Sequence, residues 1–294
     1  MTMPSPKDNP ARDGHDGTTG HEWDGITEYD TPMPSWWLYV FYATIVWSIG
    51  CWIVYPAWPS LSGYTKGLLG YSSRPELADA RAAADQARAG WLVRMRRLEP
   101  QAIAADAELR NLALAGGKAA FGENCAGCHG PGGQGGKGYP VLADDAWLWG
   151  GKLDQIWTTV RYGVRSGHDK ARVSEMPRFG GTDGLLKPEQ VADVTDYVLS
   201  LGKPGKVDAA AAARGQAVFA AQCALCHGEQ GRGKAEVGAP DLAAGIWLYG
   251  GDRGDLLQQI RAPKHGVMPA WDGRLGEATL KMLAIYVHSL GGGL

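Results

Sequence analysis

Cysteine, phenylalanine and net charge are scarce in this chain of 294 residues, and each scarcity excludes something. The chain has 29 basic and 31 acidic residues and a formal net charge of −2, so it shows no basic footprint for nucleic acid, and we expect no nucleic-acid partner. It has five cysteines, and only Cys51 lies outside two CxxC pairs. Its position in an apolar run is typical of an inert packed thiol. Phenylalanine occurs four times against 43 glycines, which predicts loop-rich domains with small cores.

The other four cysteines form two CxxCH pentapeptides. They are Cys125-Ala-Gly-Cys128-His129 and Cys223-Ala-Leu-Cys226-His227, 98 positions apart. This spacing is the attachment signature of haem c, in which both thiols bond to the haem and the histidine becomes the proximal iron ligand. The duplicated motif predicts two covalently bound haems c. With four cysteines used in this way, no intramolecular disulfide framework is possible.

Two other readings of the paired cysteines are weaker. A zinc site does not explain why both motifs continue with His-Gly. A thioredoxin-like redox centre requires a βαβ context, and neither motif follows a strand-like run. We therefore favour haem attachment.

Charged residues are absent from Trp36 to Trp58, a run of 23 residues. This length is sufficient for one membrane-spanning helix, and aromatic residues cluster at both of its ends. A cleaved signal peptide would need a basic leader and small residues at a cleavage site, whereas the residues before this run are acidic. We expect a retained anchor. Lys66 and Arg74 are the basic residues near this run, and both lie on its downstream side. They weakly favour a cytoplasmic location for the part of the chain that follows the run.

The C-terminal part of the chain is an internal repeat. In each copy a helical run enters the CxxCH motif, an aromatic-Gly-Gly signature and a Met-Pro dipeptide follow, and an amphipathic helix closes the copy. The closing helices are predicted over 189–201 and 277–290, and both end in Tyr-Val-x-Ser-Leu-Gly. This order resembles small class I cytochrome c domains. We expect a mainly α protein divided into an acidic leader (1–34), a transmembrane helix (35–58), a helical spacer (59–115), a first cytochrome c domain (116–202), a linker (203–213) and a second cytochrome c domain (214–294).

Elimination among seven methionines gives the candidate axial ligands on the far side of each iron. Met176 and Met268 each precede a proline and follow the proximal histidines His129 and His227. Methionine raises the reduction potential of a haem. The competing ligands are His168 and His265, and bis-histidine ligation by them would lower the potential. Ligation within the same repeat is the simpler reading, although the spacing leaves the pairing open. Basic residues near these loops are candidate partners of haem propionates: Arg161, Arg165, Arg178, Arg261 and Lys264.

The order of segments, together with the leader sequence from Glu22 to Asp30 (EWDGITEYD) and the Pro34-Ser-Trp-Trp37 that follows, resembles the membrane-anchored dihaem subunit of cbb3-type haem–copper oxidases, the CcoP/FixP family. The resemblance implies an electron-transfer subunit, not an enzyme on its own, that passes electrons from a donor cytochrome c toward an oxygen-reducing subunit in aerobic respiration. It implies as partners the haem–copper catalytic subunit and a monohaem cytochrome c subunit. Because haem c is attached in the bacterial periplasm, we expect a single-pass protein of the inner membrane, with its N-terminus in the cytoplasm and both haem domains in the periplasm.

Two other functions fit part of the pattern. A dihaem peroxidase also has two CxxCH motifs, but it needs one iron whose sixth position is open or displaceable. A cytochrome subunit of a periplasmic dehydrogenase would receive electrons from a substrate-oxidising partner.

Overall fold

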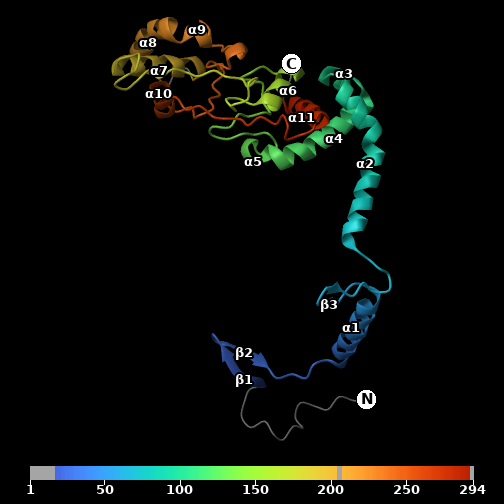
Figure 1. Ribbon diagram of the computed structural model, residues 1–294. Coiled ribbons are helices and arrows are strands. Elements are labelled where there is room, and N and C mark those ends of the chain that lie inside the picture. Colours follow the sequence, from blue (N-terminus) through green and yellow to red (C-terminus); the bar gives the residue numbers. More distant parts are fainter. Residues whose placement is uncertain (1–16, 204–206, 292–294) are drawn as a thin grey trace. The chain divides into compact units, whose positions relative to one another are not determined.

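The computed structural model describes residues 17–203 and 207–291, and the chain divides into two units, one up to Asp85 and one from Gln86 onward (Figure 1). Residues 1–16 of the predicted leader and residues 204–206 of the predicted linker lie outside the described residues. The secondary structure is mainly helical, as the sequence predicts.

The first unit contains two short hairpins and one long apolar helix. Strands β1 (Thr18–Trp23) and β2 (Ile26–Tyr29) pair antiparallel. Their turn has Asp24 and Gly25 at φ +49° and +85°, the left-handed conformations of a two-residue hairpin turn. Strands β3 (Pro59–Ser60) and β4 (Gly63–Tyr64) form the second hairpin. Neither hairpin was predicted from the sequence.

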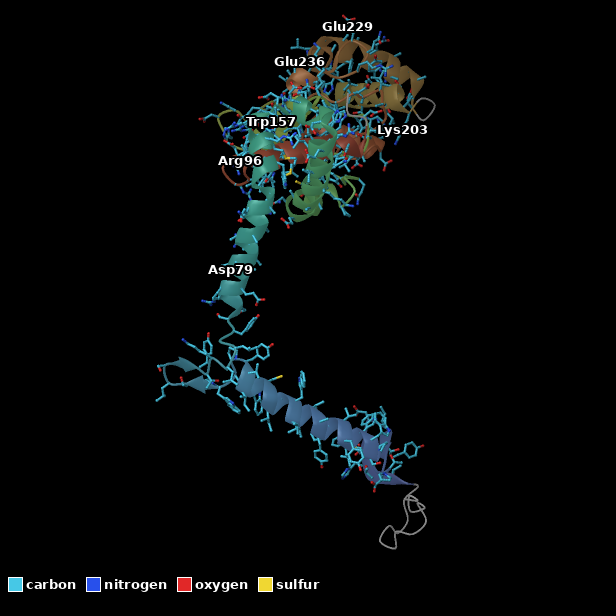
Figure 2. The ribbon with its side chains drawn as sticks, turned by 90° about the vertical axis from the view of Figure 1, so that its right-hand side faces the viewer. Asp79, Arg96, Trp157, Lys203, Glu229 and Glu236 are labelled. Atoms are coloured by element: carbon cyan, nitrogen blue, oxygen red, sulfur yellow. The ribbon has the colours of Figure 1, made fainter. Side chains whose placement is uncertain are left out.

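Helix α1 (Ser35–Val54) is long and apolar enough to cross a membrane. None of its residues is buried within the protein, and its side chains project around the helix on all sides (Figure 2). The helix ends at Val54. The sequence had predicted a later end, at residue 58. Tyr55 is extended because Pro56 follows it, and a proline disfavours helical geometry in the residue before it.

The spacer is helical, but its boundary with the first haem-binding region differs from the prediction. Helix α2 (Ser73–Arg97) leads into the second unit, followed by α3 (Pro100–Ala105) and α4 (Ala107–Asn124). The predicted boundary at 115/116 therefore falls inside α4. The Gly116-Gly117 pair lies inside this continuous helix. The two glycines allow a close contact with Met282 near the C-terminus of the chain.

The second unit contains the two CxxCH motifs in the short helices α5 (Ala126–His129) and α9 (Ala224–His227). The remaining elements are α6 (Leu153–Tyr162), α7 (Pro188–Gly202), α8 (Ala209–Gln222), the 3-10 turn η1 (Ala235–Val237), α10 (Arg253–Arg261) and α11 (Glu277–Leu290). The predicted closing helices are confirmed as α7 and α11.

The two closing helices are exchanged between the repeats. Helix α7 packs on α8 and α10 of the second repeat, whereas α11 packs on α4, α6 and α3, which precede it by more than 100 residues (Figure 1). The ring contacts repeat this pairing: Tyr286 of α11 lies 5.4 Å from Phe121, and Tyr197 of α7 lies 5.1 Å from Phe219. The predicted domains 116–202 and 214–294 are therefore not two compact bodies in chain order.

Glycines allow each exchanged pair of helices to approach closely. A Cβ atom on Gly117 of α4 would collide with the Met282 carbonyl of α11, and one on Gly215 of α8 would collide with the Asp193 carbonyl of α7. The two crossings are thus equivalent in their backbone geometry, and the backbone alone does not explain which closing helix goes where.

The side chains explain the exchange. When the shared endings of α7 and α11 are aligned in sequence, Asp193 of α7 corresponds to Met282 of α11, and Asp196 corresponds to Ile285. Met282 and Ile285 are buried in an apolar cluster formed with α2, α3 and α4, whose largest members are Met95, Ile103 and Leu109. Acidic side chains at these positions would be buried there without partners, which is costly.

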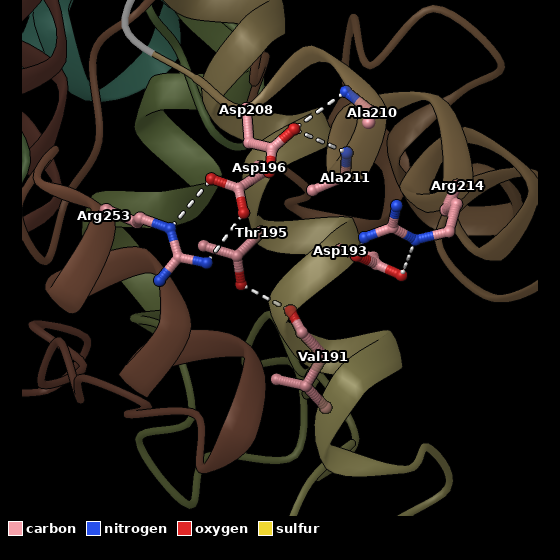
Figure 3. Close-up of polar contacts among 9 residues, drawn as sticks. All are labelled: Val191, Asp193, Thr195, Asp196, Asp208, Ala210, Ala211, Arg214 and Arg253. Atoms are coloured by element: carbon pink, nitrogen blue, oxygen red, sulfur yellow. Dashed lines mark hydrogen bonds and ion pairs between the residues drawn. The ribbon is translucent and has the colours of Figure 1, made fainter.

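On α7 the acidic side chains find arginines of the second repeat (Figure 3). Asp193 accepts hydrogen bonds from Arg214 of α8 at 2.6 and 2.9 Å. Asp196, whose side chain is only 5% exposed, accepts two from Arg253 of α10 at 2.7 and 2.8 Å. The acidic side chains of α7 therefore pair with arginines of the second repeat, and the apolar side chains of α11 pack in the apolar cluster of α2, α3 and α4.

Candidate haem sites

Each CxxCH motif forms one helical turn directly after a longer helix. The amide of His129 donates to the carbonyl of Cys125 at 2.9 Å, and that of His227 donates to the carbonyl of Cys223 at 3.0 Å. The next residues, Gly130 and Gly228, have φ +75° and +76° and end the turns in a conformation that favours glycine. This geometry accounts for the His-Gly continuation of both motifs.

Both proximal histidines are oriented by the same contact. Nδ1 of His129 lies 3.0 Å from the carbonyl of Pro140, and Nδ1 of His227 lies 3.2 Å from that of Pro240. A carbonyl can only accept a hydrogen bond, so Nδ1 carries the proton and Nε2 is left as the electron-pair donor for a metal. Burial lowers the pKa of His227 and thereby favours this neutral, ligating form.

The first cysteine of each motif is not an activated thiolate. Burial, helped by the neighbouring cysteine, raises the pKa of Cys125 to about 11 and that of Cys223 to about 11. A thioredoxin-like centre needs a thiol with a lowered pKa, so this chemistry does not fit. Within residues 17–203 and 207–291 no group of three or more His, Cys, Asp or Glu side chains is arranged to hold a metal ion.

Each candidate methionine packs beside the CxxCH motif of the repeat to which it does not belong in sequence. Met268 packs against the cluster that contains Cys125 and Ala126, whereas Met176 packs against the cluster that contains Cys223 and Ala224. This packing does not match ligation within the same repeat, the simpler interpretation of the sequence. The methionines follow the exchanged closing helices.

His168 and His265, the alternative ligands, use ring nitrogens in other contacts. Nδ1 of His168 accepts from the amide of Lys170 at 3.0 Å, and its Nε2 lies 3.7 Å from Asp272. Nε2 of His265 accepts from the amide of Met176 at 3.1 Å. These contacts do not support bis-histidine ligation.

Two buried indole groups fit a carboxylate-bearing cofactor. Among the described residues, Trp157 and Trp247 have buried Nε1 atoms with no hydrogen-bond partner in the protein. Trp157 lies in the cluster with Cys125, and Trp247 lies in the cluster with Cys223; Figure 2 labels Trp157. An unpaired buried donor is costly, and a haem propionate would supply the acceptor. The sequence signal for Trp247 was the repeated aromatic-Gly-Gly motif, whereas Trp157 had none.

Two of the arginines that the sequence suggested for propionates bind protein groups instead. Arg161 bonds to Asp272 and Glu277 at 3.0 and 2.9 Å. Arg165 donates to two backbone carbonyls.

The candidate membrane helix and the two motif-bearing bodies define a protein with two cytochrome c domains and one apolar helix near its N-terminus. Family models agree: the N-terminal domain of cytochrome oxidase-cbb3, FixP, matches residues 15–62, cytochrome c matches 114–202, and cytochrome c oxidase, cbb3-type, subunit III matches 210–287. These domains imply haem c binding.

The chain is similar to curated relatives over nearly its whole length. It is 52% identical to the cbb3-type cytochrome c oxidase subunit FixP of Bradyrhizobium sp. (strain ORS 278), covering 94% of this chain and 95% of the relative. It is 49% identical to subunit CcoP of Cereibacter sphaeroides, covering 98% and 99%, and 50% identical to FixP of Rhizobium meliloti, covering 94% of each. The chain therefore belongs to the FixP/CcoP family of cbb3-type cytochrome c oxidase subunits, and its cytochrome c domains have an electron-transfer role. The resemblance inferred from the sequence is confirmed.

Proposed function

We propose that the chain holds two covalent haems c whose axial ligands cross between the repeats. Cys125 and Cys128 bind the first haem, with His129 and Met268 as iron ligands. Cys223 and Cys226 bind the second, with His227 and Met176. The observation that carries this pairing is the packing of each methionine against the CxxCH cluster of the other repeat.

The bound haems would supply reversible one-electron chemistry, and the protein residues set the conditions for it. Pro140 and Pro240 fix the histidine tautomers through their carbonyls. A methionine thioether favours the ferrous state and raises the reduction potential. Trp157 and Trp247 offer buried N–H donors to propionates.

In the cell, the protein serves a membrane-bound oxidase. Helix α1 anchors it in the bacterial inner membrane, with the N-terminus in the cytoplasm and the haem domains in the periplasm. Electrons arrive from a donor cytochrome c and leave toward the haem–copper catalytic subunit, with which this chain and a monohaem cytochrome c subunit assemble. Support comes from the family membership, the apolar helix and the location of haem c attachment in bacteria.

The crossed pairing can be tested with variants that carry one haem. Replacing Cys125 and Cys128 by alanine leaves only the haem at Cys223. In that background Met176→Ala should abolish the sulfur-to-iron charge-transfer band of the ferric protein and open the ferrous haem to carbon monoxide. Met268→Ala is the matched control and should leave both readouts unchanged.

The reciprocal background, with Cys223 and Cys226 replaced by alanine, should give the reverse result. If Met268→Ala instead removed the band from the haem at Cys223, ligation would follow the chain order and the crossed pairing would be refuted. Recovery of the full-length protein with a dehydrogenase, and without a haem–copper subunit, would refute the proposed partners.

A further inference from the structure

The two methionine segments form one hydrogen-bonded network. Val164 and Met268 exchange amide-to-carbonyl bonds of 3.0 Å in both directions. The neighbouring amide of Arg165 donates to the carbonyl of Arg172, four residues before Met176, at 2.8 Å. Residues 164–165 thus lie between the chain segments that lead to the two methionines.

The side chain of Arg165 joins the same two segments. Its Nε donates to the carbonyl of Gly266 at 2.8 Å, and its Nη1 donates to the carbonyl of Ser174 at 2.8 Å. Gly266 is two residues before Met268, and Ser174 is two residues before Met176. One planar guanidinium therefore fixes both methionine segments at equivalent positions.

The backbone of Arg165 is strained, which makes the choice of this residue informative. Its φ is +51°, a left-handed conformation that favours glycine. Asp24 is the other described non-glycine residue with a positive φ, and it lies in an exposed hairpin turn. Glycine would satisfy the turn at residue 165 without strain, so the side chain must account for the presence of arginine.

We propose that Arg165 is a positioning residue for both axial methionines, and that its guanidinium links the ligation states of the two haem sites. This inference rests on the proposed function, in which Met176 and Met268 are the iron ligands. Release of either methionine would disturb a segment that shares its hydrogen-bond donor with the other. Lysine cannot replace this contact, because an ammonium on a flexible stem does not hold two acceptors in the fixed geometry of a guanidinium.

The test uses the full-length holoprotein in detergent with Arg165→Lys, which keeps the charge, and Arg165→Gly, which relieves the strained φ. The matched control is Arg110→Lys, because Arg110 is exposed on α4 and donates one long bond of 3.4 Å to the Ala104 carbonyl. The readouts are the ferric sulfur-to-iron charge-transfer band, the fraction of ferrous haem that binds carbon monoxide, and the reduction potential. Each is measured in the holoprotein and is then resolved by haem in the full-length one-haem variants.

We expect both Arg165 variants to raise the fraction that binds carbon monoxide about tenfold at both haems, the effect of losing one charge-assisted hydrogen bond per segment. Arg110→Lys should match the wild type. A purely structural role in the turn predicts that Arg165→Gly behaves like the wild type, and that result would overturn the proposal. So would a change at one haem only, or a shift in potential with unchanged methionine ligation, which would assign Arg165 to propionate electrostatics.

These outcomes are separable from failure of the proposed function. If the wild-type holoprotein lacks the sulfur-to-iron band, methionine ligation itself is wrong and both proposals fall. If the wild type has the band and the Arg165 variants keep it at full strength, only the role of Arg165 is wrong.

Discussion

The pair between Asp196 and Arg253 tests the exchange of closing helices, because its two residues come from different repeats. Asp196 on α7 is nearly buried, and it accepts two bonds of 2.7 and 2.8 Å from the half-exposed Arg253 on α10 (Figure 3). We propose a double-mutant cycle with Asp196→Ala, Arg253→Ala and the double variant. The assay is urea unfolding of the holoprotein, followed by circular dichroism and haem absorbance.

The magnitudes follow from burial. Asp196→Ala removes two charge-assisted bonds, but the guanidinium it leaves is half exposed and can be hydrated, so we expect a loss of about 2 kcal/mol. Arg253→Ala leaves a buried carboxylate without its partner and should cost more, about 3–5 kcal/mol. The two residues are in direct contact, so the cycle should give a coupling energy of about 1–3 kcal/mol. Additive effects would refute the contact and with it the placement of α7 on the second repeat.

Three further perturbations test the packing. Gly117→Ala should destabilise the protein by about 1–3 kcal/mol, because the added Cβ would collide with the Met282 backbone. The control is Gly122→Ala on the same helix, whose Cβ meets nothing within 4 Å and which should stabilise by about 0.5–1 kcal/mol. Equal urea midpoints for the two variants would contradict this. The buried Lys281 ammonium donates to the carbonyls of Arg96 and Leu98 at the end of α2. Lys281→Met removes both hydrogen bonds and should lower stability by about 1–3 kcal/mol. An unchanged urea midpoint would show that these two bonds do not stabilise the protein. Arg214 lowers the pKa of Asp193 below its ordinary 3.8, so the stabilisation from that carboxylate is complete above the ordinary value and is lost as the pH falls through the lowered one. Asp193→Asn should therefore be less stable than the wild type at neutral pH, and a difference that persists undiminished in strong acid would contradict the ion pair.

The sequence predicted the local features of this protein well. The CxxCH motifs, the closing helices and the long apolar helix each depend on residues that are close together in the chain. The helix end at Val54 could have been predicted from Pro56, because the effect of a proline on its neighbour is local. The β1–β2 hairpin could have been predicted from its Asp24-Gly25 turn, a dipeptide typical of two-residue hairpins.

The exchange of the repeats could not be predicted from the same signals. Helices α7 and α11 share their ending, and both cross a glycine-containing partner, so periodicity assigns them equally to either repeat. The deciding signal is the chemistry of two positions, where α7 has Asp193 and Asp196 and α11 has Met282 and Ile285. Their partners are known only once Arg214, Arg253 and the apolar residues of α2 and α3 are located in space. The proposed methionine pairing rests on this exchange, so it could not be predicted from the sequence either.

The most direct measurement is a crystal structure of the full-length holoprotein, with both irons located by their anomalous scattering. The structure predicts that the sulfur bonded to the iron beside Cys125 and His129 belongs to Met268, and that the sulfur on the iron beside Cys223 and His227 belongs to Met176. Finding Met176 on the first iron and Met268 on the second would contradict this account.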